Sequence, residues 1–227
     1  MNEAIFKKYN VPVPRYTSYP TANRFEEFSA EQYLKAVEAS NNATADNISF
    51  YIHVPFCQHL CHYCGCNSVA MAKSERIEAY FAALHKEIDL LLPHLRKDRK
   101  ISQIHYGGGS PSSMPLTHIR ALNEHLLSAF DTIDQPEIAI ECHPGYLKME
   151  DWQYLLDSRF NRFSLGIQDF DDEVLHAVNR HPSLLPVADI IQLLRKGGAR
   201  VNFDFIYGLP RQTVEKFVAT IEAAIAL

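Results

Sequence analysis

The chain has 227 residues, of which 47% are hydrophobic and 22% are charged, and its formal net charge is −5. This composition is typical of a globular protein with a sizeable core, and a chain without basic blocks is not expected to bind nucleic acid. The first residues lack the apolar run of a secretion signal, and no later run is long enough for a membrane helix. We therefore expect a cytoplasmic protein that does not contact membranes.

The amino-terminal part of the chain is predicted to be an arm followed by one short helix. Residues 1–28 contain several prolines, which break helices, so we expect irregular structure there. Ser29 and Gln32 form a capping-box pattern that opens a helix running to about Ser40. A polar linker, 41–47, follows the helix. The sequence therefore predicts a first domain at 1–47 and a second at 48–227.

From residue 48 onward, the sequence alternates between expected strands and expected helices. Strands are predicted at 48–54, 101–106, 137–142, 162–167 and 200–206. Helices are predicted at 74–92, from 115, at 149–158, 171–179 and 184–196, and from 213 to the last residue. This order predicts an α/β fold with a parallel sheet and outer helices, either barrel-like or doubly wound.

The residues at the strand ends favour the barrel. A cysteine-rich loop follows the first strand, a triple glycine follows the second, and the other three end in Glu141, in Gln168 with Asp169, and near Asp204. Barrel enzymes build their sites from all strand ends, whereas a doubly wound sheet would mark only the strands beside its switch point. Because the apolar segment 223–227 ends in mid-helix, we expect a partial parallel (β/α) barrel. The alternative, a complete five-unit domain, would leave the fifth strand as an unpaired edge.

Four of the five cysteines lie within ten positions. Cys57, Cys61 and Cys64 have C-x3-C-x2-C spacing, and Cys66 follows two residues later. Soft thiolates grouped this closely bind a soft metal ion or an iron–sulfur cluster. A cluster held by three thiolates keeps one iron open for a small ligand. The alternative is a structural zinc site that uses all four cysteines, although no second pair of ligands accompanies them.

Further candidate ligand-binding residues follow the later strands. Gly107–Pro111 offers backbone N–H groups without β-carbons, but it lacks the Gly-Lys-Ser/Thr of a phosphate loop. Glu141 is either a ligand-binding carboxylate or a solvated end residue. Gln168 offers both a donor and an acceptor, and Asp204 alternates with two phenylalanines and so points away from their face. Arg180 either pairs with a carboxylate or lies on the surface.

Three stretches of the sequence resemble one family of enzymes. They are 14–22 (PRYTSYPTA), 51–66 (YIHVPFCQHLCHYCGC) and 206–213 (IYGLPRQT). Together they are similar to the oxygen-independent coproporphyrinogen III oxidases (dehydrogenases) of the radical S-adenosylmethionine (SAM) superfamily. The resemblance runs over essentially the whole chain and corresponds to the N-terminal half of such an enzyme. It implies a radical SAM barrel without its last unit and without a C-terminal domain. A related haem-chaperone branch shares the triad but typically lacks Cys66 and the arm.

The resemblance implies roles for individual residues. Cys57, Cys61 and Cys64 would hold a four-iron four-sulfur cluster. The SAM molecule bound to that cluster would contact Tyr51, Gly108 and Glu141. A second SAM would contact Tyr63, Cys66, Gly109, Ser110, Gln168, Arg180 and Asp204. Ser110 stands where the family usually has threonine, and it keeps the hydroxyl. No catalytic residue beyond the cofactors is implied.

The resemblance also implies a reaction and partners. An electron from the reduced cluster would cleave SAM to methionine and a 5′-deoxyadenosyl radical, which takes hydrogen from a propionate of coproporphyrinogen III. Loss of carbon dioxide and one electron would leave a vinyl group, and two such events would give protoporphyrinogen IX. The implied partners are this small-molecule substrate and a reducing electron-donor protein, and we expect a monomer. A haem-binding chaperone and a zinc-stabilised structural domain stay open as alternatives.

Overall fold

The computed structural model describes residues 3–11, 21, 24–42 and 46–227. The chain forms two compact units, Met1–Asn42 and Ala43–Leu227, and each is described by itself. Apart from Thr21, the family-like segment 14–22 lies outside the described residues. The division into domains at residue 47 stays a prediction.

The first unit contains two helices, one of which the sequence did not predict. Helix α1 spans Glu3–Tyr9, so the expectation of irregular structure throughout 1–28 was wrong. The prolines begin only at residue 12 and do not interrupt this short helix. Helix α2 spans Ala30–Ser40, and its capping box is confirmed. The Gln32 N–H donates to Ser29 Oγ at 3.2 Å, and the Ser29 N–H donates to Gln32 Oε1 at 2.8 Å.

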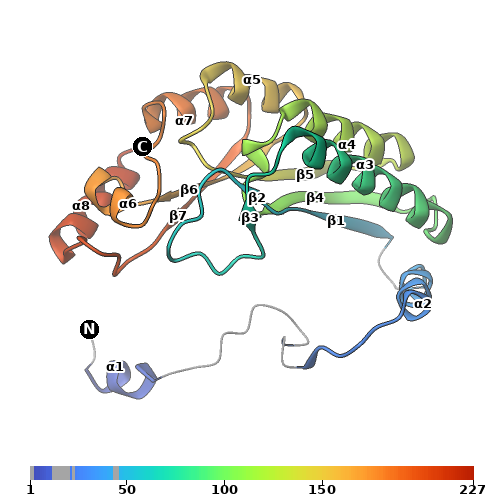
Figure 1. The fold of residues 1–227 in the computed structure, drawn as a ribbon, viewed down its shortest axis with the longest axis horizontal. Helices are drawn as coiled ribbons and strands as arrows, with labels where there is room; N and C mark the ends of the chain where they lie inside the picture. The colour runs from blue at the N-terminus through green and yellow to red at the C-terminus, as the bar shows by residue number, and fades with distance from the viewer. Residues whose placement is uncertain (1–2, 12–20, 22–23, 43–45) are drawn as a thin grey trace. The chain divides into compact units, whose positions relative to one another are not determined.

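The second unit is built on a parallel sheet of five strands (Figure 1). The strands are β1 (Asn47–Val54), β4 (Lys100–Gly108), β5 (Thr132–Cys142), β6 (Arg162–Gln168) and β7 (Arg200–Phe205). They pair in chain order, with β1 and β7 as the outer strands of the described sheet. In a doubly wound sheet the strand order reverses at a switch point, and this order does not reverse. Sequential parallel strands are the arrangement of a (β/α) barrel, and the described sheet is an unclosed segment of one. The predicted partial parallel (β/α) barrel is thereby confirmed.

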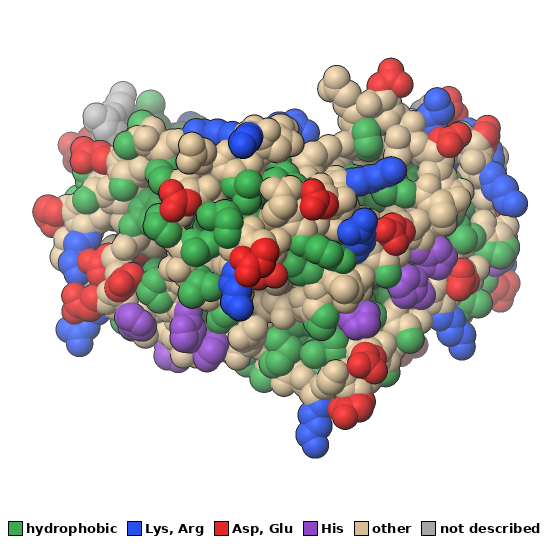
Figure 2. Space-filling model, turned by 90° about the horizontal axis from the view of Figure 1, so that it is seen from above, with side chains coloured by type: hydrophobic (Ala, Val, Ile, Leu, Met, Phe, Trp, Pro, Cys, Tyr) green, Lys and Arg blue, Asp and Glu red, His purple; other side chains and the backbone are tan. Residues whose placement is uncertain are grey.

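Helices cover one face of this sheet. They are α3 (Ser74–Leu91), α4 (Leu116–Ala129), α5 (Met149–Asp157) and α7 (Val187–Lys196), while α6 (Asp172–Ala177) and α8 (Val214–Ile225) lie beside β6 and β7 (Figure 1). Short 3-10 turns of this unit include η2 (Leu92–His94) and η3 (Pro111–Ser113). Seen from the side of the helices, acidic, basic and hydrophobic side chains are intermixed, and histidines gather in groups (Figure 2). No helix of the described residues is both long and apolar enough to cross a membrane.

The core lies between the sheet and its helices. Fully buried strand residues such as Ile104, Ile140 and Leu165 pack in one cluster with Trp152 of α5 and Leu194 of α7. Strand residues alternate between faces, so the polar residues between these apolar ones lie on the opposite face of the sheet. Packing of the apolar side chains against the helices therefore determines which side chains lie on the opposite face of the sheet.

Several element boundaries differ from the sequence-based expectation. Strand β5 begins at Thr132 rather than at residue 137, and α7 begins at Val187, after Pro186 rather than at residue 184. A residue that precedes proline is disfavoured in helical conformation, which explains the later start of α7. Helix α8 ends at Ile225 rather than continuing to the last residue.

Candidate cofactor site

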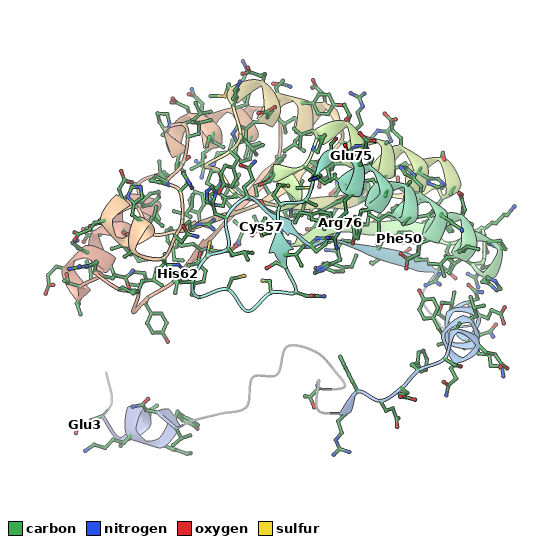
Figure 3. All side chains as sticks on the ribbon, viewed as in Figure 1. Glu3, Phe50, Cys57, His62, Glu75 and Arg76 are labelled. Carbon is green, nitrogen blue, oxygen red and sulfur yellow. The ribbon has the colours of Figure 1, made fainter. Side chains whose placement is uncertain are left out.

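The cysteine loop connects β1 to α3 and is closed at its base by a two-stranded sheet. Strands β2 (Phe56–Cys57) and β3 (Val69–Ala70) pair there, which the sequence did not predict. Cys57 therefore sits on an ordered strand, and the other three thiols lie on the excursion between the two strands. Figure 3 shows Cys57 at the base of the loop and His62 further along it. Cys57, Cys61 and Cys64 form no disulfide within the described residues.

The thiols of the loop lie close enough to influence one another. Burial raises the pKa of Cys57 to about 11, with further upward contributions from the thiolates of Cys64 and Cys61. A hydrogen bond with Ser68 acts in the opposite direction. Thiolates are the form that binds metal, so cationic iron offsets the repulsion that keeps Cys57 protonated. This donor set fits an iron–sulfur cluster.

A cavity of about 250 Å³ opens beside the loop, at the carboxyl ends of the strands. Its walls include the loop after β1, the glycine turn after β4, and the ends of β5, β6 and β7. Every predicted site residue except Tyr51 lines it: Cys57, Cys61, Tyr63, Cys64, Cys66, Gly108, Gly109, Ser110, Glu141, Gln168, Arg180 and Asp204. The structure thus brings residues from five strand ends to one mouth.

The glycine turn fits against the cysteine loop only because it lacks side chains. A β-carbon on Gly109 would lie 2.5 Å from the carbonyl oxygen of Pro55 and 2.9 Å from the Sγ of Cys57. Gly108 has a φ of +118°, which favours glycine. The N–H of Gly109 donates to Val54 O at 2.8 Å, and that of Ser110 donates to Phe56 O at 3.0 Å. The backbone of this turn therefore lies directly against Cys57.

Glu141 is held in place by two contacts, although its side chain is 43% exposed. Its Oε2 accepts a hydrogen bond from the Gly108 N–H at 3.3 Å, and its Oε1 lies 3.2 Å from the Nε2 of His105. Tyr51 is 60% exposed and stacks on His105 with ring centroids 5.9 Å apart. Burial, followed by the charge of Glu141, raises the pKa of Tyr51. Tyr51 therefore lies beside Glu141, just outside the lining of the cavity.

Arg180 and Tyr63 form the deepest polar part of the cavity. Arg180 is only 8% exposed, so the surface reading was wrong. Its guanidinium donates to Cys61 Sγ at 3.5 Å and to the Gly166 carbonyl, and none of its hydrogen bonds within the described chain goes to a carboxylate. The Tyr63 hydroxyl is buried without a hydrogen-bond partner among the described residues. Burial raises the Tyr63 pKa, Arg180 lowers it and Cys61 raises it. An orphaned buried hydroxyl fits a ligand site.

The ends of β6 and β7 place two polar side chains in the cavity and turn a third away. Gln168 has a φ of +67° at an irregularity of the strand pairing, and such strain in a non-glycine residue is typical of functional sites. Asp204 accepts hydrogen bonds from Ser164 Oγ at 2.9 Å and Asn202 Nδ2 at 3.0 Å. Asp169, expected at the same mouth, is 1% exposed and accepts instead from Thr220 Oγ1 at 2.6 Å.

Several cavity-lining residues had escaped the sequence analysis, among them two histidines and a tyrosine. His59, His143 and Tyr146 line the cavity, and the His59 Nδ1 lies 2.8 Å from the Tyr146 hydroxyl oxygen. They come from two separate loops, so their sequence spacing gave no signal. Burial lowers the pKa of His143 to about 3, with further contributions from the positive charges of Arg180, His181 and His59.

The arrangement suits a cluster as the bound group. No three His, Cys, Asp or Glu side chains in the described part of the chain converge as a single-ion site requires. The thiolates of a four-iron cluster bind different irons and need not converge on one point. Cys57, Cys61 and Cys64 thus have the chemistry that such a cluster requires.

Comparison with known proteins identifies the class. Residues 51–224 match the radical SAM superfamily, and the chain belongs to it. Membership implies a four-iron four-sulfur cluster and SAM as cofactors.

Among its relatives are two oxygen-independent coproporphyrinogen III oxidases. The Helicobacter pylori protein is 37% identical over 98% of this chain, and the Escherichia coli protein is 38% identical over 96%. The chain spans about half the length of these curated relatives, 50% and 48% respectively. The solved structure of E. coli coproporphyrinogen III oxidase, described as a radical SAM enzyme, matches with a TM-score of 0.82 and 34% identity. That match covers 99% of this chain and 50% of the other.

Proposed function

We propose that this chain carries the cofactor-binding part of an oxygen-independent coproporphyrinogen III oxidase, which converts propionates of coproporphyrinogen III to vinyl groups. One observation carries the proposal. A cysteine triad faces a cavity built from five strand ends, in a chain that is about a third identical to such oxidases along nearly its whole length.

We assign the cluster to Cys57, Cys61 and Cys64. When bound, the cluster and SAM supply a reductive cleavage that gives a carbon radical able to abstract hydrogen. The guanidinium of Arg180, against Cys61, offsets part of the negative charge that the thiolates gather. Glu141, fixed by Gly108 and His105, offers a carboxylate to the SAM bound to the cluster, and we assign Tyr51 beside it to the same SAM.

We assign a second SAM site to Tyr63, Cys66, Gly109, Ser110, Gln168, Arg180 and Asp204. The unpartnered Tyr63 hydroxyl and the strained backbone of Gln168 support a ligand there, because both are costly unless a bound group compensates them. The hydroxyl of Ser110 lies 2.7 Å from that of Ser113 and its N–H donates to Phe56 O at 3.0 Å, so Ser110 lines this site with both groups already hydrogen-bonded.

The proposal includes partners and location. The substrate is a small-molecule porphyrinogen, the reductant is an electron-donor protein, and the enzyme works as a cytoplasmic monomer. The names of the relatives support the substrate, and the electron donor follows from the family resemblance.

Anaerobic reconstitution followed by an assay tests the proposal. The chain should bind about four irons, lose them in the Cys61→Ala variant and keep them in the Cys142→Ala variant. With SAM, a reductant and coproporphyrinogen III, it should form 5′-deoxyadenosine and release carbon dioxide. Stoichiometric zinc without iron would support the structural-domain alternative. Haem uptake with no conversion of coproporphyrinogen would support the chaperone instead.

A further inference from the structure

Three aromatic side chains, His59, Tyr146 and His181, are in contact beside the cavity, and the mechanism above uses none of them. His59 and Tyr146 line the cavity, and His181 lines the neighbouring pocket, which also contains Asp169 and Asp172. His59 belongs to the cysteine loop, Tyr146 to the loop after β5, and His181 to the loop after α6. The rings of His59 and His181 have centroids 4.4 Å apart, and those of Tyr146 and His181 lie 5.8 Å apart. We call these three residues the aromatic rim.

Hydrogen bonding within the aromatic rim leaves donors free to face outward. His59 Nδ1 and the Tyr146 hydroxyl oxygen are 2.8 Å apart. When the hydroxyl donates to Nδ1, the neutral imidazole carries its hydrogen on Nε2, where it is a donor. His59 and His181 are both exposed, so their N–H groups can reach a ligand at the mouth of the cavity.

One fixed cation, Arg180, acts on both Tyr146 and His143, whereas the thiolates of Cys61 and Cys57 act on Tyr146 with the opposite sign. His143 lies directly behind the aromatic rim, with its ring centroid 4.4 Å from that of Tyr146. The groups that act on His143 are Arg180, His181 and His59, all cations or potential cations, and they disfavour its protonation. The carboxylates of the cavity wall are engaged elsewhere, Glu141 with Gly108 and His105, and Asp204 with Ser164 and Asn202. Arg180 is therefore the charged group beside the aromatic rim that attracts an anion.

We propose that the aromatic rim is a carboxylate-binding subsite, which takes a propionate of the tetracarboxylate substrate. The proposal deepens the proposed function and rests on it for the identity of the ligand. Imidazole N–H donors at the mouth, a fixed guanidinium behind them and apolar ring faces match a propionate, whose charged head follows two methylene groups. The carboxylate of SAM has the same chemistry, and the experiment separates the two sources.

The test uses a stable, fluorescent probe that differs from its control only in charge. Coproporphyrin III carries four carboxylates, and its tetramethyl ester carries none. Binding of both is measured by fluorescence titration of the reconstituted chain, and binding of SAM by calorimetry. The variants are His181→Phe and Tyr146→Phe, which keep a ring at each position. His176→Phe, an exposed histidine of α6 outside the cavity, is the matched control.

The expected result is a loss confined to the charged probe. The parent chain and His176→Phe should bind coproporphyrin III about tenfold more tightly than its ester, and His181→Phe should lose about that tenfold preference, as expected for one charge-assisted hydrogen bond. Tyr146→Phe should show a smaller loss in the same direction. Circular dichroism establishes that both variants are folded.

The other outcomes separate this subsite from the proposed function. If both variants weaken SAM binding and leave the porphyrin unaffected, the aromatic rim binds a carboxylate, but that of SAM. If folded variants bind all three ligands as the parent does, the subsite is overturned while porphyrin binding still supports the proposed function. If the parent chain binds neither porphyrin and the variants bind SAM normally, both proposals fail.

Discussion

Polar side chains at the amino ends and at the carboxyl ends of the parallel strands differ in their hydrogen bonding. At the amino ends, Glu137 of β5 accepts hydrogen bonds from Arg162 at 2.9 Å, Arg200 at 3.1 Å and Gln103 at 2.7 Å. At the carboxyl ends, the Tyr63 hydroxyl is buried without a partner in the described chain, and the Cys57 thiol is kept protonated by burial and by its neighbours. The carboxylates at both ends are paired internally, but the carboxyl end also carries a buried hydroxyl and a protonated thiol that a ligand can engage.

This contrast shows where the sequence encodes stability and where it encodes function. A polar group that is paired internally contributes to folding, whereas an unpaired one destabilises the empty protein until a ligand arrives. In barrels, the carboxyl ends of the strands carry the active site. Mutation can test whether hydrogen bonding within the protein, rather than location at one end of the sheet, distinguishes structural from ligand-binding residues.

The largest effect is expected at the glycine turn. Gly109→Ala places a methyl group 2.5 Å from the Pro55 carbonyl oxygen, so the turn must move away from the cysteine loop. We expect a loss of about 3 kcal/mol in the free energy of unfolding, together with loss of iron after reconstitution. Gly198→Ala is the matched control, because its φ is +76° but nothing lies within 4 Å of the new methyl. It should cost about 1 kcal/mol and leave iron content unchanged. Equal iron contents in the two variants would refute this account of the turn.

The next effect tests whether position at the mouth is enough to make a residue functional. Asp169 follows β6 but accepts from Thr220 Oγ1 at 2.6 Å, from the Asp171 N–H at 2.9 Å and from Gln212. Asp169→Ala leaves these donors without an acceptor and should cost about 2 kcal/mol in urea denaturation. Asp169→Asn keeps an acceptor oxygen and should cost less. A variant that is as stable as the parent chain would show that this paired carboxylate is not structural.

A smaller effect is expected at the amino ends. Burial raises the pKa of Glu137, but hydrogen bonds from Arg162 and Gln103 and the charges of Arg162 and Arg200 outweigh it, so the pKa is lower than its usual 4.5. Its contribution is therefore present above pH 4.5 and is lost as the pH falls through the folded-state pKa. Glu137→Gln should cost about 1 kcal/mol at pH 7, because both arginines are partly exposed. Denaturation at acidic pH should show the parent and variant converging, and a constant difference would contradict the assignment.

The sequence predicted the strands and the cysteine loop that surround the site, because strand periodicity and close cysteine spacing can both be recognised in a sequence. The strand ends and the spacing of Cys57, Cys61 and Cys64 predicted where the cavity lies, and the family resemblance supplied the individual residues, of which all but Tyr51 line it. Asp169 was misplaced because the pairing shifts between Gly166 and Gln168, and the left-handed Gln168 reverses the simple alternation of the strand. A local irregularity of this kind leaves no periodic trace in the sequence.

Other features were missed because they depend on contacts between distant segments. Strands β2 and β3 have two residues each, too short to show a period, and they exist because the loop returns on itself. The aromatic rim joins His59, Tyr146 and His181 from three loops, and only the assembled fold brings their rings together. Helix α1 has seven residues and was hidden by the prolines that follow it.

The smallest effect gives the sharpest comparison, because the same substitution should have opposite signs at two tyrosines. Tyr106→Phe removes a buried hydroxyl that donates to Asn123 Oδ1 at 2.8 Å, and it should cost about 1 kcal/mol. Tyr63→Phe removes a buried hydroxyl without a partner in the described chain, so the cluster-free protein should gain up to about 1 kcal/mol. The Tyr63 variant should nevertheless bind SAM about tenfold more weakly after reconstitution. If both variants lose stability equally and SAM binding is unchanged, the Tyr63 hydroxyl is a structural group and the contrast between the strand ends does not extend to it.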